Sequence, residues 1–260
     1  MSEELILLER EQDLATVILN RPHKLNALIK PMWQQLGDVM LSLSAEDDLR
    51  CIVLRGTGDR SFAPGNDISE FKDARSNSVD AKAYGDIHHQ ALAAIADCRH
   101  PVVALIQGIC VGGGLEIASL CDLRICGESS RFGVPINRLG LCVGIREMQA
   151  LYNLVGKAVT LEILLEGRVF DAAEAMQKGL VTRVVADGDV AQEAYASARR
   201  IADGAPLVAR WHKQFMRRQA DPSPLSEAEK DLSYLCYDTE DFHIGYNSFL
   251  DKIKPEFKGK

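Results

Sequence analysis

A single carboxylate, Glu116, lies inside an apolar segment that directly follows three consecutive glycines. The stretch CVGGGLEIASLCD covers residues 110–122 and runs from Gly112, Gly113 and Gly114 into Leu115 and its apolar neighbours. A glutamate is almost never fully buried without a partner, because moving its charged form out of water is costly. Glu116 is therefore either a buried structural hydrogen-bonding group or an acid/base group with a chemical task.

The glycines before Glu116 leave backbone N–H groups open to a ligand, because they carry no Cβ atom. The start of a helix favours negative charge, so this loop can stabilise an oxyanion that forms during a reaction. A second glycine-bearing loop, GTGDRSFAPGNDISEF at residues 56–71, also follows an expected strand. The alternative is that the glycines serve only a tight turn with close packing.

Short segments rich in β-branched residues alternate with longer segments of helical periodicity. The expected strands are residues 14–20, 50–56, 101–108, 123–128 and 180–186, and the expected helices include residues 29–47 and 80–98. Asp171 is expected to cap a further helix, with Glu174 completing a capping box and Gly179 ending the helix. This alternation predicts an α/β core, and from about Gly144 onward the pattern is largely helical.

Composition excludes several classes of protein. The chain has 260 residues, 47% of them apolar, which is enough for a large core. A net charge of −7 without a basic run argues against a nucleic-acid surface. The N-terminal residues show no signal-peptide pattern, and no apolar run is long enough for a membrane span.

The seven cysteines lie mostly within apolar runs, which is typical of buried free thiols in a reducing compartment. We therefore expect a location in the cytoplasm or an organelle matrix. The cysteine and histidine spacings fit no common metal site, so no metal is expected. The chain also lacks the usual nucleotide-binding and nucleophile motifs.

Five segments, in order along the chain, resemble the crotonase superfamily, also called the enoyl-CoA hydratase/isomerase family. The segments are ILNRPHKLNAL (18–28), SFAPGNDISEF (61–71), IQGICVGGGLEIASLCDLRIC (106–126), LVGKAVTLEILLEGRVFDAAEAMQKGLVTRVV (154–185) and SFLDKIKPEFKGK (248–260). The resemblance covers nearly the whole chain.

This resemblance implies a spiral of ββα turns that forms two sheets, with an acyl-CoA-binding core over residues 1–195. Residues 196–260 would form a helical region that assembles trimers, commonly paired into hexamers. The implied substrate is an acyl-CoA thioester of the kind met in fatty acid metabolism. CoA would arrive as part of the substrate, with no separate cofactor.

The resemblance also assigns site residues. The backbone N–H groups of Asn66 and Gly113 would bind the thioester oxygen as it becomes an enolate, and Glu116 would be one of two catalytic carboxylates. The implied CoA-binding residues are His23, Lys24, Leu25, Asp67 and Ile68, together with Phe249 and Lys252 of the terminal helix, often from a neighbouring subunit.

The chain departs from the hydratase pattern at the second carboxylate. Where hydratases carry a glutamate after the proline of a segment like RFGVPINRLGL (131–141), this chain has Ile136. The next stretch reads GIREMQ (144–149) in place of a glycine-rich run. Glu147 either replaces the lost acid or pairs with Arg146, and we favour the pairing because glutamate is ordinary in a first helical turn.

Several activities remain open on these residues. Hydration classically uses two carboxylates, so a hydratase would rely on Glu116 with a water or with Glu147. An isomerase needs only one base, and a decarboxylase relies mainly on the oxyanion hole. A non-catalytic acyl-CoA-binding protein is the alternative outside enzymes. His88 and His89 lie on the helix that would face the acyl pocket, and each either contacts substrate or is an exposed or satisfied histidine.

Overall fold

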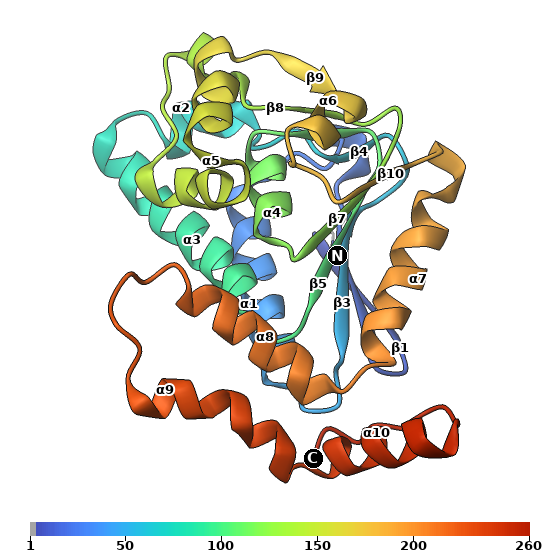
Figure 1. Ribbon diagram of the computed structural model, residues 1–260. Coiled ribbons are helices and arrows are strands. Elements are labelled where there is room, and N and C mark those ends of the chain that lie inside the picture. The colour runs from blue at the N-terminus through green and yellow to red at the C-terminus, as the bar shows by residue number, and fades with distance from the viewer. Residues whose placement is uncertain (1–3) are drawn as a thin grey trace.

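A six-stranded sheet forms the centre of the computed structural model, which describes residues 4–260 (Figure 1). Its order is β1-β2-β3-β5-β7-β10, and only β1 and β2 pair antiparallel. The strands are β1 (Ile6–Glu11), β2 (Leu14–Leu19), β3 (Cys51–Gly56), β5 (Val102–Ile106), β7 (Leu123–Gly127) and β10 (Arg183–Val185). Every residue of β2 and β5 is buried, as expected for strands covered on both faces. The five expected strands are thus confirmed.

A second sheet of four strands, ordered β4-β6-β8-β9, lies beside the first. The strands are β4 (Ser61–Ala63), β6 (Ile109–Val111), β8 (Arg131–Gly133) and β9 (Val169–Asp171). Each has only three residues, which is too short for an alternating pattern to be recognised in the sequence. The two sheets together match the fold that the family resemblance implies.

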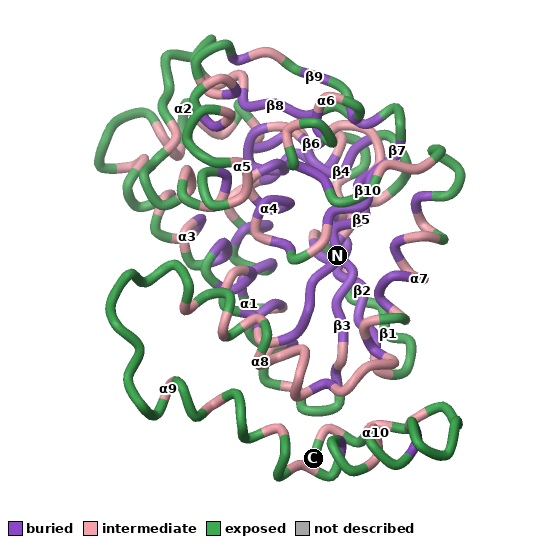
Figure 2. Tube along the Cα trace, in the orientation of Figure 1, coloured by how far each residue is buried: buried purple, intermediate pink, exposed green. Residues whose placement is uncertain are grey.

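Helices cover both faces of the large sheet. The helices α1 (Lys30–Ala45) and α3 (Ser78–Ala96) pack side by side on one face, and α7 (Val190–Ala202) covers the other (Figure 1). Buried segments run along the sheet and the inner sides of these helices (Figure 2). On α7, Ala194, Ala198 and Ala202 are fully buried, so this helix approaches β3 and β5 with a stripe of small side chains.

The helices near the small sheet are α2 (Phe71–Ala74), α4 (Gly113–Leu120), α5 (Ile145–Glu166) and α6 (Ala172–Gln177). Asp171 caps α6 by accepting the N–H of Glu174 at 2.9 Å, as predicted. The reciprocal half of a capping box does not form at this helix. The carboxylate of Glu174 instead accepts hydrogen bonds from Arg168 and lies 3.2 Å from Lys178.

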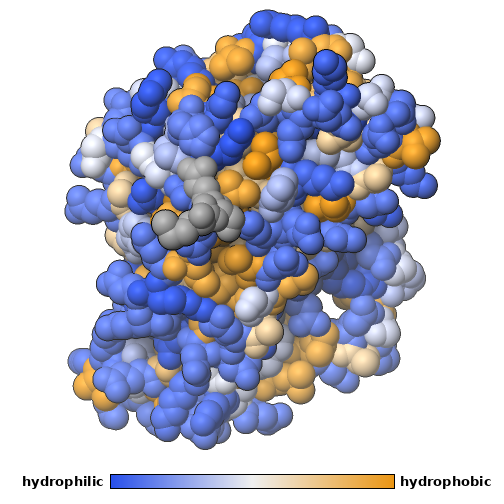
Figure 3. All heavy atoms as spheres, turned by 180° about the vertical axis from the view of Figure 1, so that it is seen from behind, coloured by the Kyte–Doolittle hydropathy of each residue, from blue (hydrophilic) through white to orange (hydrophobic). Residues whose placement is uncertain are grey.

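The C-terminal helices α8 (Pro206–Arg218), α9 (Glu227–Asp231) and α10 (Glu240–Asp251) lie at one end of the molecule (Figure 1). The apolar side chains exposed there include those of Tyr234, Leu235, Tyr237, Phe249 and Leu250. Seen from behind, apolar side chains gather in a band between the body of the molecule and its lower end (Figure 3). The expected boundary between residues 195 and 196 falls inside α7, which packs on the sheet. The division of the chain into two regions stays a prediction. Residues 1–3 of the first region lie outside the described chain.

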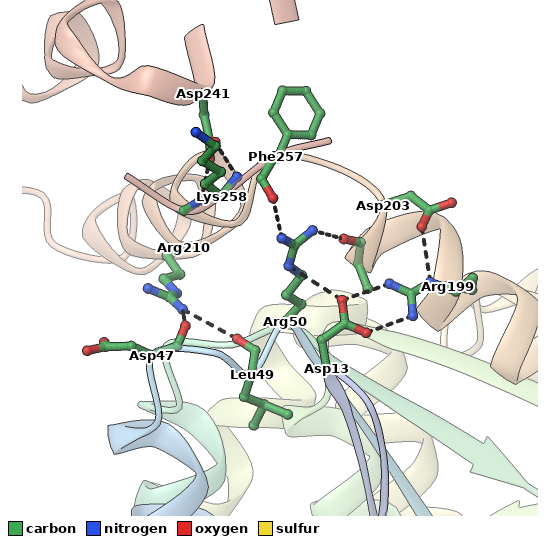
Figure 4. Close-up of polar contacts among 12 residues, drawn as sticks. Asp13, Asp47, Leu49, Arg50, Arg199, Asp203, Arg210, Asp241, Phe257 and Lys258 are labelled. Atoms are coloured by element: carbon green, nitrogen blue, oxygen red, sulfur yellow. Dashed lines mark hydrogen bonds and ion pairs between the residues drawn. The ribbon is translucent and has the colours of Figure 1, made fainter. Parts of the chain in front are cut away.

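One arginine connects the C-terminal tail to the body. The Arg50 guanidinium donates to the carbonyl oxygen of Phe257 and to that of Ala202, and it lies 3.4 Å from Asp13 (Figure 4). Asp241 of α10 accepts the backbone N–H groups of residues 258 and 259 at 2.6 and 2.9 Å. These contacts hold the tail between α10 and the end of α7.

Five of the seven free cysteines are buried. Burial raises the pKa of Cys51 to about 12, so its thiol stays protonated and unreactive at neutral pH. Within residues 4–260, no helix combines the length and the apolar character that crossing a membrane requires.

Candidate active site

Glu116 lies in the first turn of α4 and faces a cavity of about 260 Å³. The apolar neighbours Leu115, Ile117 and Ala118 are buried in the core, whereas 16% of the Glu116 side chain is exposed to solvent. The carboxylate therefore stands at the wall of a cavity and is not sealed within the core.

The three glycines before Glu116 meet separate steric needs. Gly112 has a positive φ of 52°, which disfavours any residue with a side chain. A Cβ on Gly114 would lie 2.1 Å from the carbonyl oxygen of Ala63, and one on Gly113 would lie 3.2 Å from the Trp33 ring. Close packing of α4 on β4 is thus one reason for the glycines, and it leaves the N–H end of α4 bare.

The backbone N–H groups of Asn66 and Gly113 belong to residues that line the same cavity as Glu116. The Leu28 N–H donates to the carbonyl oxygen of Gly65, and the Leu28 carbonyl oxygen accepts the N–H of Asp67, both at 2.8 Å. The N–H of Asn66, between these two residues, takes no part in this pairing. Neither the Asn66 nor the Gly113 N–H donates to another group within residues 4–260. Two open amides and one carboxylate therefore meet at one cavity.

Aromatic side chains fix the Asn66 side chain behind this cavity. The Trp33 indole N–H donates to Asn66 Oδ1 at 2.7 Å, and the Tyr84 hydroxyl donates to Glu70 Oε2 at 3.1 Å. Burial, with Glu70 close by, raises the pKa of Tyr84, which therefore remains a neutral donor. The sequence analysis missed Trp33, although a buried indole N–H usually needs a partner and could have signalled one.

His88 is buried between Trp33 and two carboxylates. Its ring centroid lies 4.1 Å from that of Trp33, and only 5% of its side chain is exposed. Its Nε2 lies 3.2 Å from Glu116 Oε2, and its Nδ1 lies 3.8 Å from Glu147 Oε1. The reading of His88 as an exposed or satisfied histidine is wrong, because Nε2 has no well-aligned hydrogen bond within residues 4–260.

Glu147 pairs with His89, and the expected pairing with Arg146 is wrong. His89 Nε2 lies 2.7 Å from Glu147 Oε1, which joins the first turn of α5 to α3. Neighbouring residues of a helix point in different directions, and Arg146 is exposed at a second cavity. Glu147 also lines the cavity that holds Glu116.

Ile136 contributes an apolar wall to this cavity. It lies in the 3-10 segment η3 (Pro135–Leu139), and Leu139, Leu141 and Val143 extend the same wall. A second cavity of about 400 Å³ adjoins the first, and Glu116 and Glu147 line both. The two carboxylates thus stand between a cavity with open amides and a second cavity lined by His89 and Arg146.

The residues assigned to CoA fall into two groups. His23 and Lys24 belong to a short turn, η1 (Pro22–Lys24), followed by Leu25 in a left-handed conformation. Arg21, just before this turn, donates to Asp67 Oδ2 at 2.7 Å and thereby connects the turn to the loop of Asn66. That hydrogen bond, followed by those from Ser69, lowers the pKa of Asp67 to about 2.

Ile68 is exposed at the rim of the cavity, so the first group lies close to the site. Phe249 and Lys252 belong to the C-terminal end of α10, which lies at the opposite end of the molecule from α2 (Figure 1). A single chain therefore does not bring these two residues to the cavity.

Comparisons with known proteins agree with this architecture. The enoyl-CoA hydratase/isomerase family matches residues 9–260. The chain is 35% identical over 260 residues to a probable enoyl-CoA hydratase of Mycobacterium bovis, covering 99% of each chain. It is 32% identical over 262 residues to the crotonyl-CoA hydratase of Syntrophomonas wolfei, covering both chains completely.

A crystal structure described as an enoyl-CoA hydratase/carnithine racemase from Magnetospirillum magneticum is also similar. It has a TM-score of 0.98 and 47% identity, with 100% of this chain and 97% of that chain covered. The fold is that of a crotonase-type protein. The chain belongs to the enoyl-CoA hydratase/isomerase family, and it is an enzyme of that family.

Proposed function

We propose that this enzyme transfers a proton at the α-carbon of an enoyl-CoA thioester, with Glu116 as the acid/base group. The observation that carries the proposal is the meeting of the Glu116 carboxylate with the open N–H groups of Asn66 and Gly113 at one cavity. A base next to two amide donors fits a reaction in which a C–H bond breaks while negative charge grows on a carbonyl oxygen.

The two amides supply the electrostatic part of this chemistry. Removing a proton next to a thioester places charge on the thioester oxygen, and each fixed N–H donor that meets this charge is worth about 3 kcal/mol in the transition state. The Gly113 N–H also lies at the positive end of α4. Ordered donors of this kind need no reorganisation when the charge develops.

The acid/base residue determines which reactions follow. One carboxylate can remove a proton from the α-carbon and return it elsewhere, which is isomerisation. In hydration, Glu116 would pass a proton between a water and the α-carbon, with Ile136 giving no help from the opposite position. The apolar wall at Ile136 specifically favours the one-base isomerase as the second candidate within this class.

The CoA part of the substrate would lie across the turn of His23, Lys24 and Leu25 and the loop of Asp67 and Ile68. The nearness of these two segments, joined by the ion pair of Arg21 and Asp67, supports this placement. No cofactor beyond substrate CoA is needed for a proton transfer. We also propose a homotrimer or a dimer of trimers, in which Phe249 and Lys252 reach a neighbour's CoA, because α10 exposes apolar side chains and lies far from its own cavity.

The test is an assay in deuterated water with crotonyl-CoA and with a 3-enoyl-CoA. Hydrated product from crotonyl-CoA would establish the hydratase, and a conjugated product from the 3-enoyl ester with deuterium at the α- or γ-carbon would establish the isomerase. Tight binding of both esters without turnover or exchange would contradict the proposal. It would direct the search to decarboxylation or to a binding protein.

A further inference from the structure

The buried row Glu116, His88, Glu147 and His89 connects the substrate cavity with the second cavity. From Glu116 Oε2 the successive contacts are 3.2 Å to His88 Nε2, 3.8 Å from His88 Nδ1 to Glu147 Oε1, and 2.7 Å from Glu147 Oε1 to His89 Nε2. The exposed part of the side chain is 5% for His88 and 28% for His89. The row thus begins at the reacting carboxylate and ends at solvent.

Two atoms at the start of this row are buried without a well-aligned hydrogen bond in the described chain. They are His88 Nε2 and Glu116 Oε2, and they face each other. Leaving two polar atoms unsatisfied is costly unless they share a proton in some state of the enzyme. Both atoms are closed off from solvent, whereas the Glu116 side chain as a whole is 16% exposed and lines both cavities.

We infer that His88 is a positioning residue that relays protons between Glu116 and solvent in the second cavity, through Glu147 and His89. The inference rests on the proposed role of Glu116. It assigns the second cavity, which His89, Arg146 and Asn153 line together with the two carboxylates, as the route for solvent protons, beside the cavity that takes the thioester. The 3.8 Å step is longer than a hydrogen bond, so the His88 ring must shift to complete it.

The proton balance of the relay is closed. When Glu116 takes the α-proton, the C–H electron pair passes into the enolate and the carboxylate becomes a carboxylic acid. That acid gives a proton to His88 Nε2, while the Nδ1 proton of the imidazole passes to Glu147 and on to His89 and water. A solvent proton returns by the reverse steps, so no oxidant, reductant or co-reactant is consumed. Imidazole suits the central place because it can donate at one nitrogen and accept at the other.

The relay predicts a difference between two rates. Turnover of an enoyl-CoA gives Glu116 its proton from the substrate itself or from the attacking water and does not need the relay, whereas exchange of the α-hydrogens of butyryl-CoA in deuterated water needs solvent protons that the relay supplies. His88→Gln should therefore lower the ratio of exchange rate to turnover rate by about tenfold or more. A merely structural role would lower both rates together and leave the ratio unchanged.

The experiment compares four proteins by mass spectrometry of butyryl-CoA and by turnover of crotonyl-CoA and a 3-enoyl-CoA. The first two proteins are the wild type and His88→Gln. The third is Glu147→Gln, which interrupts the same row of residues and keeps the test possible if His88→Gln does not fold. His212→Gln, an exposed histidine of α8, is the matched control. Thermal unfolding and affinity for butyryl-CoA verify each fold.

The expected result is a low ratio in both relay variants and an unchanged ratio in the control. An unchanged ratio in the folded relay variants would overturn the relay and leave the role of Glu116 intact. A wild type without exchange and without turnover would overturn the proposed function, and the relay with it.

Discussion

At the scale of single residues, the departure from the hydratase pattern that bears on the acid/base chemistry is one apolar side chain. Ile136 lines the cavity where the family pattern places a second glutamate. Glu147 lines the same cavity, but its carboxylate already accepts from His89 at 2.7 Å. The carboxylate that remains available for substrate is therefore that of Glu116.

Restoring the second carboxylate should increase hydration. Ile136→Glu places an acid/base group at the cavity wall, and a positioned group of this kind contributes about 100-fold or more. We expect faster hydration of crotonyl-CoA, measured by loss of the conjugated absorbance, with Ile136→Gln as the uncharged control. No gain in a folded variant would show that the missing carboxylate at position 136 does not limit hydration.

The sequence identified Glu116 and Ile136 because they stand next to motifs, whereas for His88 and Glu147 it left a role in the pocket and an ordinary structural role both open. Whether a histidine of a helix is exposed depends on the partner that packs on it. Here the partner is α5, which begins more than 50 residues after His88 in the sequence. Glu147, in the first turn of α5, lies close to His88. Contacts of that range have no local signature.

At the scale of elements, the seating of α4 on β4 sets the geometry of the site. A Cβ on Gly114 would lie 2.1 Å from a backbone oxygen of Ala63, so α4 or β4 would have to move. We expect Gly114→Ala to reduce stability by about 1–3 kcal/mol and to impair turnover, because the same helix carries Gly113 and Glu116. Urea unfolding and turnover check this.

The matched control for this substitution is Gly188→Ala, where a Cβ would meet nothing within 4 Å and φ is not positive. It should leave stability and turnover near the wild-type values. Equal effects of the two substitutions would contradict the steric account of the triple glycine.

The ion pair that connects the turn of His23 and Lys24 to the loop of Asn66 should affect the stability of the fold in acid. Its partners, Arg21 and Asp67, are largely buried, and the pKa of Asp67 is lowered from 3.8 to about 2. A lowered carboxyl pKa stabilises the fold above the unfolded value, and this contribution is lost as the pH falls from about 4 toward 2. It amounts to about 2 kcal/mol at most.

Asp67→Asn should therefore destabilise the protein at pH 7 and less so at about pH 3. Urea unfolding at both pH values measures the difference in free energy, and Asp59→Asn in the exposed part of the preceding loop is the control. A difference between wild type and variant that does not change with pH would contradict the assignment.

The main sheet was more predictable than the small sheet. Five of its six strands were predicted: β2, β3, β5 and β7, which have five or six residues, and the three-residue β10, whereas β1 was not. The helices α1 and α3 were predicted as well, but β4, β6, β8 and β9, of three residues each, were not. Those four strands pair with segments far away in sequence, so their existence depends on the completed fold.

At the scale of the whole molecule, the C-terminal helices present an apolar surface that a second copy can cover. Phe249 is 83% exposed and Leu250 is 58% exposed on α10. A soluble monomer rarely leaves such side chains grouped in the open. The proposed assembly would also account for Phe249 and Lys252, which match CoA positions of the family in the resemblance but lie far from their own cavity.

Phe249→Asp should shift the protein toward smaller species and weaken binding of butyryl-CoA. Light scattering coupled to gel filtration gives the mass, and we expect a trimer or hexamer for the wild type. Val79→Asp, which is 76% exposed at the start of α3, is the control. A monomeric wild type with full affinity for the ester would contradict the proposed assembly.

The measurement that tests the central claim most directly is α-hydrogen exchange of butyryl-CoA in deuterated water by the wild type and by Glu116→Gln. The substitution keeps the shape of the side chain and removes the base, so exchange should fall by about 100-fold or more while affinity for the ester stays nearly intact. The account would be contradicted if Glu116→Gln exchanged the α-hydrogens as fast as the wild type.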